Sequence, residues 1–211
     1  MNSASIKRGG ALIFFAFTVG FLGMAIASRK GPVEVPEIDY SASSFVLVLE
    51  LGGKSSGTVY IELYPGVAPK NVQRIIELAR EGAYDGIAFH QVFEGILAQT
   101  GDVQYGAVEG YDPAYVGRGS SDKFDVEAEF SDIPFVKGVV AMFHGKSPDS
   151  ANSQFFIVLE DQPNLDGKYT AIGRVVSGMV QVSNIQTGGR GNNGVVLGNP
   201  DYIKRAYIEE Y

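Results

Sequence analysis

Two apolar runs in the first third of the chain show the pattern of β-strands. Residues 44–51 (SFVLVLEL) and 57–63 (GTVYIEL) are rich in β-branched and other large apolar side chains. The stretch between them, Gly-Gly-Lys-Ser-Ser, has the composition of a turn. Such runs joined by a short Gly-rich connection predict an antiparallel hairpin.

The apolar period then lengthens from that of a strand to that of a helix. Val72, Ile75, Ile76 and Ala79 recur at the spacing that places them on one helical face. Proline is tolerated in the first turn of a helix, which suits residue 69 as its start, and residue 82 is a glycine suited to its C-terminal cap.

Short strand-like segments make up much of the remaining chain. A second helix is predicted at residues 177–186, a Gly/Asn-rich loop at 188–194 and a closing strand at 202–209. Asp166 and Gly167 mark a tight turn. Many short strands with one early and one late helix predict a mainly β fold, a closed antiparallel barrel with capping helices. The other predicted strands are residues 88–92, 96–99, 138–142, 154–159 and 171–176.

The N-terminal segment has a different pattern from all of these. Residues 9–27 carry no charge, and basic residues flank both ends. As a helix they would rise about 28 Å, close to the thickness of the hydrocarbon core of a bilayer. They lack the polar face of a surface helix and also end in Ala25-Ile26-Ala27, a small-x-small pattern that fits signal-peptide cleavage. Both an uncleaved membrane anchor and a removed signal peptide fit this segment.

These patterns divide the chain into three parts. Residues 1–29 are predicted to be a signal peptide or a single membrane anchor, and residues 30–44, with two prolines and several acidic residues, a linker. Residues 45–211 form one domain. If residues 9–27 act as an export signal, that domain lies outside the cytoplasm, in the periplasm or an equivalent lumen.

Composition excludes several classes of chemistry. The net charge of −7 argues against a nucleic-acid partner, which would favour a basic face. The chain has no cysteine, which excludes disulfides, thiol nucleophiles and cysteine-bound metals. Its two histidines, His90 and His144, are too few for most histidine-based metal sites. We interpret His90 as a structural strand residue and His144 as a residue at a groove edge or surface.

Three ordered blocks resemble the cyclophilin family of peptidyl-prolyl isomerases. Residues 61–72 (IELYPGVAPKNV) are similar to the strand-to-helix entry of that family. Residues 89–92 (FHQV) and 99–102 (QTGD) resemble its second block. The third comprises Met142 and residues 150–157 (SANSQFFI) and 165–169 (LDGKY). Tyr169 and the short loop before Gln154 are similar to bacterial-type members.

The resemblance implies an eight-stranded barrel closed by two helices, with a shallow groove that binds X-Pro peptides and needs no cofactor. In such a groove an arginine stabilises the twisted prolyl amide, a glutamine holds a neighbouring carbonyl, and Phe, Met, Phe and Leu line the pocket. The resemblance assigns the glutamine role to Gln99. It assigns the pocket walls to Ile96, Leu97, Phe156 and Leu165, with Phe143, His144, Asn164 and Tyr169 as further substrate-binding residues.

Five site positions depart from the family pattern. Gln91 stands where the catalytic arginine is expected and offers a neutral amide in place of a charged guanidinium. Phe143 stands where a small residue is usual, and Asn164 where a large one is common. Ile96 replaces the usual phenylalanine of the wall and Leu97 the usual methionine, which keeps the wall apolar but changes its shape. We expect these changes to reduce catalysis more than peptide binding.

Two functions follow from this combination. The first is a prolyl isomerase that acts on exported or membrane proteins, with reduced activity because of Gln91. The alternative is a catalytically weak binding module that residues 9–27 would anchor to the membrane, where it would serve a larger membrane protein complex as an accessory subunit.

Overall fold

The computed structural model describes residues 45–211, and the predicted N-terminal anchor or signal segment and the linker lie outside this range. The described part has two α-helices, α1 (Pro69–Arg80) and α2 (Met179–Ser183), and one antiparallel sheet whose strands differ in length. The strands are β1 (Phe45–Gly52), β2 (Gly57–Leu63), β3 (Ile87–Ala88), β4 (Gln91–Phe93), β5 (Leu97–Thr100), β6 (Val139–Met142), β7 (Phe155–Val158), β8 (Ala171–Ser177) and β9 (Tyr202–Glu210).

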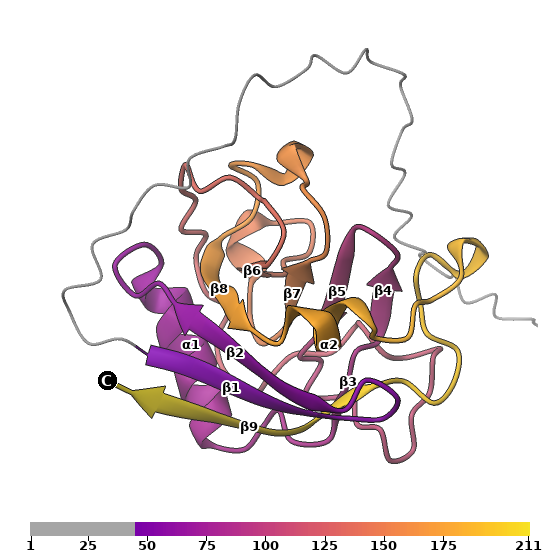
Figure 1. Cartoon of the computed structure of the whole chain (residues 1–211). Helices are drawn as coiled ribbons and strands as arrows, with labels where there is room; N and C mark the ends of the chain where they lie inside the picture. The colour runs from indigo at the N-terminus through magenta and orange to yellow at the C-terminus, as the bar shows by residue number, and fades with distance from the viewer. Residues whose placement is uncertain (1–44) are drawn as a thin grey trace, which may run out of the picture. The chain divides into compact units, whose positions relative to one another are not determined.

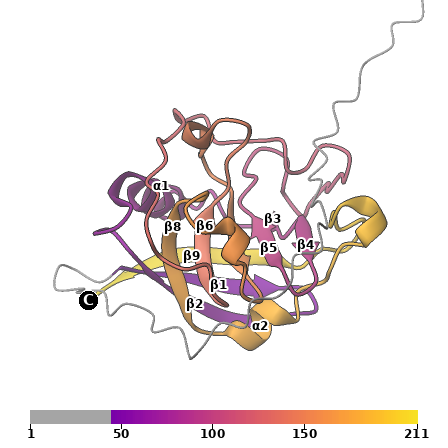
Figure 2. The ribbon, with the colours of Figure 1, turned by 90° about the horizontal axis from the view of Figure 1, so that it is seen from above.

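The strands of the sheet lie in the order β3-β9-β1-β2-β8-β6-β7-β5-β4, and the sheet curls (Figure 1). Viewed from above, α1 and α2 lie at different places around this curl (Figure 2). Short 3-10 turns are present at η1 (Pro148–Ser150), η2 (Pro163–Leu165) and η3 (Arg190–Asn192). The mainly β antiparallel architecture with two helices is confirmed, while closure into a barrel stays a prediction.

The strand count differs from the eight that the resemblance implied. The predicted strand at residues 88–92 is divided into β3 and β4, which lie at opposite ends of the sheet order. The reason is a change of partner: Phe89 N donates to Asp201 O beside β9, whereas His90 N donates to Gln99 O of β5. One continuous segment therefore supplies both end strands of the sheet.

The helix limits follow from local backbone chemistry. α1 has Pro69 in its first turn, as predicted. It ends where Gly82 takes a φ of 70°, and the Gly82 and Ala83 N–H groups donate to the carbonyls of Ala79 and Leu78. This is the Schellman arrangement, which satisfies the last carbonyls of a helix. The second helix is shorter than residues 177–186, because Ser177 pairs with Tyr60 in the sheet and α2 begins only after Gly178.

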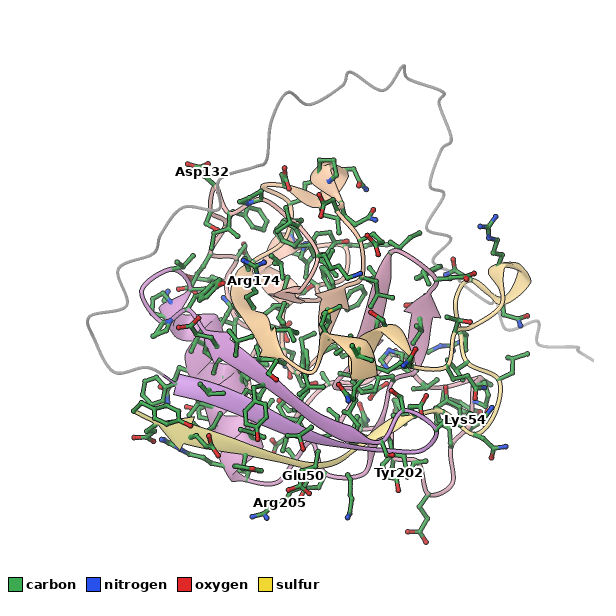
Figure 3. The ribbon with its side chains drawn as sticks, in the orientation of Figure 1. Glu50, Lys54, Asp132, Arg174, Tyr202 and Arg205 are labelled. Carbon is green, nitrogen blue, oxygen red and sulfur yellow. The ribbon has the colours of Figure 1, made fainter. Side chains whose placement is uncertain are left out.

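Strand alternation separates an interior core from an outer face. Leu47, Leu49 and Ile61 belong to the interior apolar cluster, which the buried face of α1 completes. On the outer face of β1 and β9, the paired residues Glu50 and Arg205 point away from the sheet together (Figure 3). A second apolar cluster lies over β6 and β7, outside the first, and it positions the candidate site.

Candidate active site

Strand register aligns four side chains across four neighbouring strands. Gln91 of β4 pairs with Gln99 of β5, Gln99 pairs with Phe156 of β7, and Phe156 pairs with Ala141 of β6. Directly paired residues point to the same face, with Cβ atoms about 4.5–5.5 Å apart. We call these four residues the cross-strand row. It brings two amide side chains and an aromatic ring together on one face.

A relay of amides holds Gln99 in place. Its side chain is buried, and its Nε2 donates to Gln154 Oε1 at 2.8 Å. Gln154 Nε2 in turn donates to the Gly119 carbonyl at 2.8 Å. A glutamine NH2 has two hydrogens, so one N–H of Gln99 remains for a ligand carbonyl. The relay therefore orients a donor without consuming it.

Gln91 is held by the loop at residues 188–194, a contact that the sequence did not predict. Val92 N donates to Gly194 O and Gly188 N to Val92 O, so the loop docks along the free edge of β4. The half-buried Gln91 donates from Nε2 to Asn193 O at 2.8 Å. Asn193 reaches this position in the left-handed region, at a φ of 52°, which asparagine adopts more readily than most residues.

The predicted pocket residues gather beside this row. Phe156 and Leu165 are buried in the second apolar cluster, and Leu97, Phe143 and Tyr169 pack against it. Phe155 belongs instead to the interior core, as the alternation of the two phenylalanines along a strand predicts. The structure therefore places five of the predicted substrate-binding side chains in one apolar group.

Ring contacts continue this group towards the surface. The Phe156 ring meets Tyr169 edge-on at 5.2 Å, and Tyr169 stacks on His144 at 4.6 Å between ring centroids. The two ring nitrogens of His144 lie 3.0 Å from Gly145 O and 2.9 Å from Lys168 O, which fixes the ring orientation. Burial raises the pKa of the Tyr169 phenol, so it keeps its proton at neutral pH.

Two predicted residues lie at the margin of this group. Ile96 is exposed in the turn between β4 and β5 and does not belong to the second apolar cluster. Asn164 is exposed in η2, next to the buried Leu165. Its backbone carbonyl accepts a hydrogen bond from Lys168 Nζ at 2.9 Å. Both positions can contribute only to the rim.

His90 lies behind the row, inside the molecule. Its side chain is buried, with the Ala88 backbone and the Gln154 side chain beside its ring. Burial lowers the pKa of His90 to about 4, although the nearby Asp102 carboxylate opposes the shift. The structural role predicted for His90 agrees with this position.

Sequence reasoning missed two contributors to the site, Gln154 and Asn193, and one neighbour of it, Phe130. Gln154 lies two residues before Phe156, and side chains at this spacing share one face of a strand, so its place beside Gln99 had a signal. Asn193 had no such signal, because its contact depends on docking of a distant loop. Phe130 had no signal in the sequence either, because its ring approaches His144, at 6.5 Å, only in the folded structure.

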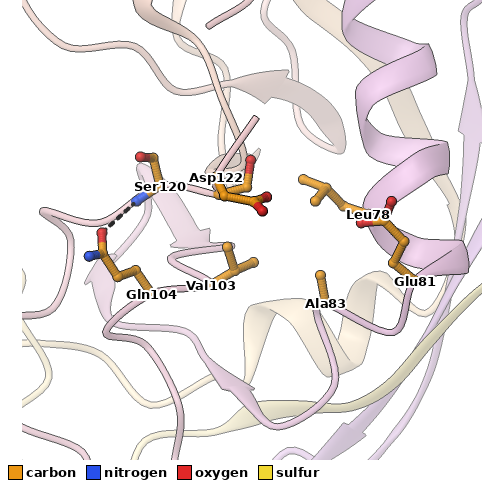
Figure 4. Close-up of a pocket in the computed structure, with 8 residues that line it drawn as sticks. Leu78, Glu81, Ala83, Val103, Gln104, Ser120 and Asp122 are labelled. Atoms are coloured by element: carbon orange, nitrogen blue, oxygen red, sulfur yellow. Dashed lines mark hydrogen bonds between the residues drawn. The ribbon is translucent and has the colours of Figure 1, made fainter. Parts of the chain in front are cut away.

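A shallow hollow elsewhere on the domain has a different lining. It lies between the end of α1 and the loop after β5, where Gln104 Oε1 accepts a hydrogen bond from Ser120 N (Figure 4). Glu81 and Asp122 give it an acidic edge. It contains none of the predicted site residues, so we assign the site to the row. The complete lining is Leu78, Glu81, Ala83, Val103, Gln104, Ser120, Ser121 and Asp122.

The chemistry available at the row is non-covalent. None of its four members is a nucleophile or an ionisable group, but two have amide donors and one a buried aromatic ring. An apolar ring next to fixed N–H donors can hold an apolar ring of a ligand and an adjacent carbonyl oxygen. These are the two features that a peptide containing proline presents.

Comparisons with known proteins match the chain to one protein family. The family model "Cyclophilin type peptidyl-prolyl cis-trans isomerase/CLD" matches residues 46–208. A probable peptidyl-prolyl cis-trans isomerase of Brucella suis is 53% identical over 154 residues, which cover 72% of this chain and 78% of the relative. The isomerase ppi1 of Schizosaccharomyces pombe is 41% identical over 129 residues, covering 59% and 76%.

Two solved structures share the fold. Cyclophilin AquaCyp293 of Hirschia baltica has a TM-score of 0.62 at 23% identity, covering 77% of this chain and 76% of that one. A Cryptosporidium parvum cyclophilin-type isomerase, solved in the presence of the dipeptide Ala-Pro, has a TM-score of 0.63 at 20% identity, covering 78% and 98%. From the family match and the relatives together, the chain belongs to the cyclophilin-type peptidyl-prolyl cis-trans isomerases.

Proposed function

We propose that the cross-strand row is the isomerase site and binds the X-Pro segment of a protein substrate. The proline ring packs against Phe156, with Leu97 and Leu165 beside it. The amide donor of Gln99 faces the neighbouring carbonyl, and that of Gln91 faces the prolyl nitrogen. The observation that carries this proposal is the register that aligns Gln91, Gln99 and Phe156 on one face.

The reaction needs no covalent intermediate. An X-Pro amide rotates over a barrier of about 18–20 kcal/mol, because its C–N bond has partial double-bond character. In the twisted transition state, conjugation is lost and the nitrogen regains a lone pair. Donors that meet this state better than the planar amide accelerate rotation. A fixed proline ring and oriented amides supply such a preference.

We further propose that the isomerase activity is reduced because Gln91 stands where an arginine is expected. A neutral hydrogen bond is roughly half as strong as a charge-assisted one. Loss of one preorganised donor to a developing charge typically costs on the order of 100- to 1,000-fold in rate. In addition, the Gln91 amide already donates to Asn193 O, so its engagement with substrate competes with an existing contact.

The test of this site is Gln91→Arg, measured as kcat/KM for isomerisation of a short X-Pro peptide. We expect an increase of about tenfold or more, because a guanidinium provides the charge that the amide lacks. Gln73→Arg, on the exposed surface of α1, is the matched control that adds the same charge elsewhere. An unchanged kcat/KM, with the same unfolding midpoint as the parent protein, would overturn this account.

The sequence of residues 1–29 supports a proposal about where the domain works and on which proteins. We propose that the domain works outside the cytoplasm on exported or membrane proteins, either anchored by residues 9–27 or released after Ala27. Intact-mass measurement on native protein distinguishes an N-terminus at Met1 from one near Ser28. Fractionation of cells tests the location, and recovery of the domain with a cytoplasmic marker enzyme would contradict it.

A second candidate function is a binding module in a larger membrane complex. Three features favour it: the tethered Gln91, the aromatic Phe143 inside the groove and the exposed Asn164 on its rim. The two functions differ in a measurable way. An accessory module would bind X-Pro peptides without accelerating their isomerisation, even in the variant Gln91→Arg. It would also co-purify with one membrane protein in a fixed ratio.

A further inference from the structure

An aromatic side chain is held at the surface next to the proposed proline pocket. Phe130 is 44% exposed, and its ring lies 6.5 Å from that of His144. Through His144 and Tyr169 it connects to Phe156 by successive ring contacts. We call Phe130, His144 and Tyr169 the aromatic shelf.

The backbone next to Phe130 is held by hydrogen bonds, which restricts where its ring can lie. The preceding residue, Glu129, donates its backbone N–H to Thr170 Oγ1 at 2.9 Å. Its carboxylate accepts from the Asn71 backbone N–H at 3.0 Å and from Asn71 Nδ2 at 2.8 Å. These bonds connect the Phe130 segment to α1 and to the residue preceding β8.

The other two shelf residues are equally constrained. His144 lies between two carbonyl oxygens and under the Tyr169 ring, and Tyr169 also contacts Phe156 edge-on. A ligand would therefore meet a surface whose rotamers are already ordered, which avoids much of the entropic cost of binding. Aromatic faces and edges of this kind favour other aromatic or large apolar groups.

We propose that the aromatic shelf selects substrates with an aromatic or large apolar residue within two positions of the proline. This inference rests on the proposed peptide site, with which the shelf is continuous. An extended chain advances about 3.3–3.6 Å per residue, so a residue one or two places from a proline at Phe156 reaches the neighbouring rings. Covering the exposed part of Phe130 is worth about tenfold in affinity by area.

Four series of terminally blocked peptides test the shelf, with X one or two places before the proline (Ala-X-Pro-Ala and X-Ala-Pro-Ala) or after it (Ala-Ala-Pro-X and Ala-Ala-Pro-Ala-X). Dissociation constants are measured by NMR titration for X as alanine, glutamate, leucine and phenylalanine. We expect phenylalanine and leucine to bind about tenfold more tightly than alanine in at least one series. Phe130→Ala should abolish this preference and leave the affinity for the alanine peptides unchanged.

Phe124→Ala is the matched control, because this phenylalanine is 95% exposed and has no ring contact with the shelf among the described residues. It should leave the preference intact. Equal affinity for all X, or a preference that survives in Phe130→Ala, would refute the shelf alone. Failure of every peptide to bind would refute the proposed peptide site and the shelf with it.

Discussion

Burial of His90 makes the stability of the domain depend on pH in a definite direction. In the folded protein the pKa of His90 is lowered to about 4 by desolvation, whereas an exposed histidine titrates near 6.5. Between these values the unfolded chain binds a proton that the folded protein does not. Stability therefore falls as pH decreases from about 6.5 to about 4, and His90 contributes no further change below that range.

The magnitude follows from the size of the shift. Each pKa unit corresponds to 1.36 kcal/mol, so the His90 contribution amounts to about 3 kcal/mol across the full window. That is a large part of the 5–15 kcal/mol typical of a whole domain. Most of it should already be lost at a pH of about 4.5.

The assay is urea unfolding of the parent protein and of His90→Leu at neutral and mildly acidic pH. Leucine is apolar and cannot titrate, so the substitution removes the ionisable group from this buried position. The free energy of unfolding of the variant, relative to the parent, should rise by about 2–3 kcal/mol between pH 7 and pH 4.5.

Carboxylates titrate in both proteins, so their contribution largely cancels in this difference. His144→Leu is the control, because His144 is only half-buried and packs on the outer face. If the free energies of unfolding of the parent and His90→Leu differ by the same amount at both pH values, the reasoning is refuted. Folding would then not be coupled to protonation of His90.

Two further predictions concern packing around the site. Gln154→Leu should lower the free energy of unfolding by about 1–3 kcal/mol and also reduce kcat/KM, because it leaves the Gly119 carbonyl unpaired and releases the Gln99 amide. Gly178→Ala should lower the melting temperature, because Gly178 has a φ of 93° and a Cβ there would overlap the Thr58 carbonyl. Gly66→Ala, whose Cβ would meet nothing within 4 Å, should not, and equal melting temperatures for the two variants would contradict the steric argument.

Local patterns determined the elements of this protein that depend on neighbours along the chain. The hairpin of β1 and β2, the apolar face of α1 and its end at Gly82 are all set by short-range periodicity and backbone preference. The motif blocks also predicted residues of a pocket. Each of these residues lies within or next to a recognisable motif, and five of them gather in the structure.

The tertiary structure alone decided how these pieces meet. Register sets Gln99 of β5 beside Phe156 of β7, and no local pattern specifies pairing between strands so far apart in sequence. The division of β3 from β4, the docking of Asn193 on Gln91 and the approach of Phe130 to His144 likewise depend on long-range contacts. The sequence by itself determined which side chains the site can use, because residue type and period are local properties. The fold decided which of them touch, because cross-strand contacts are settled only when distant segments pack together.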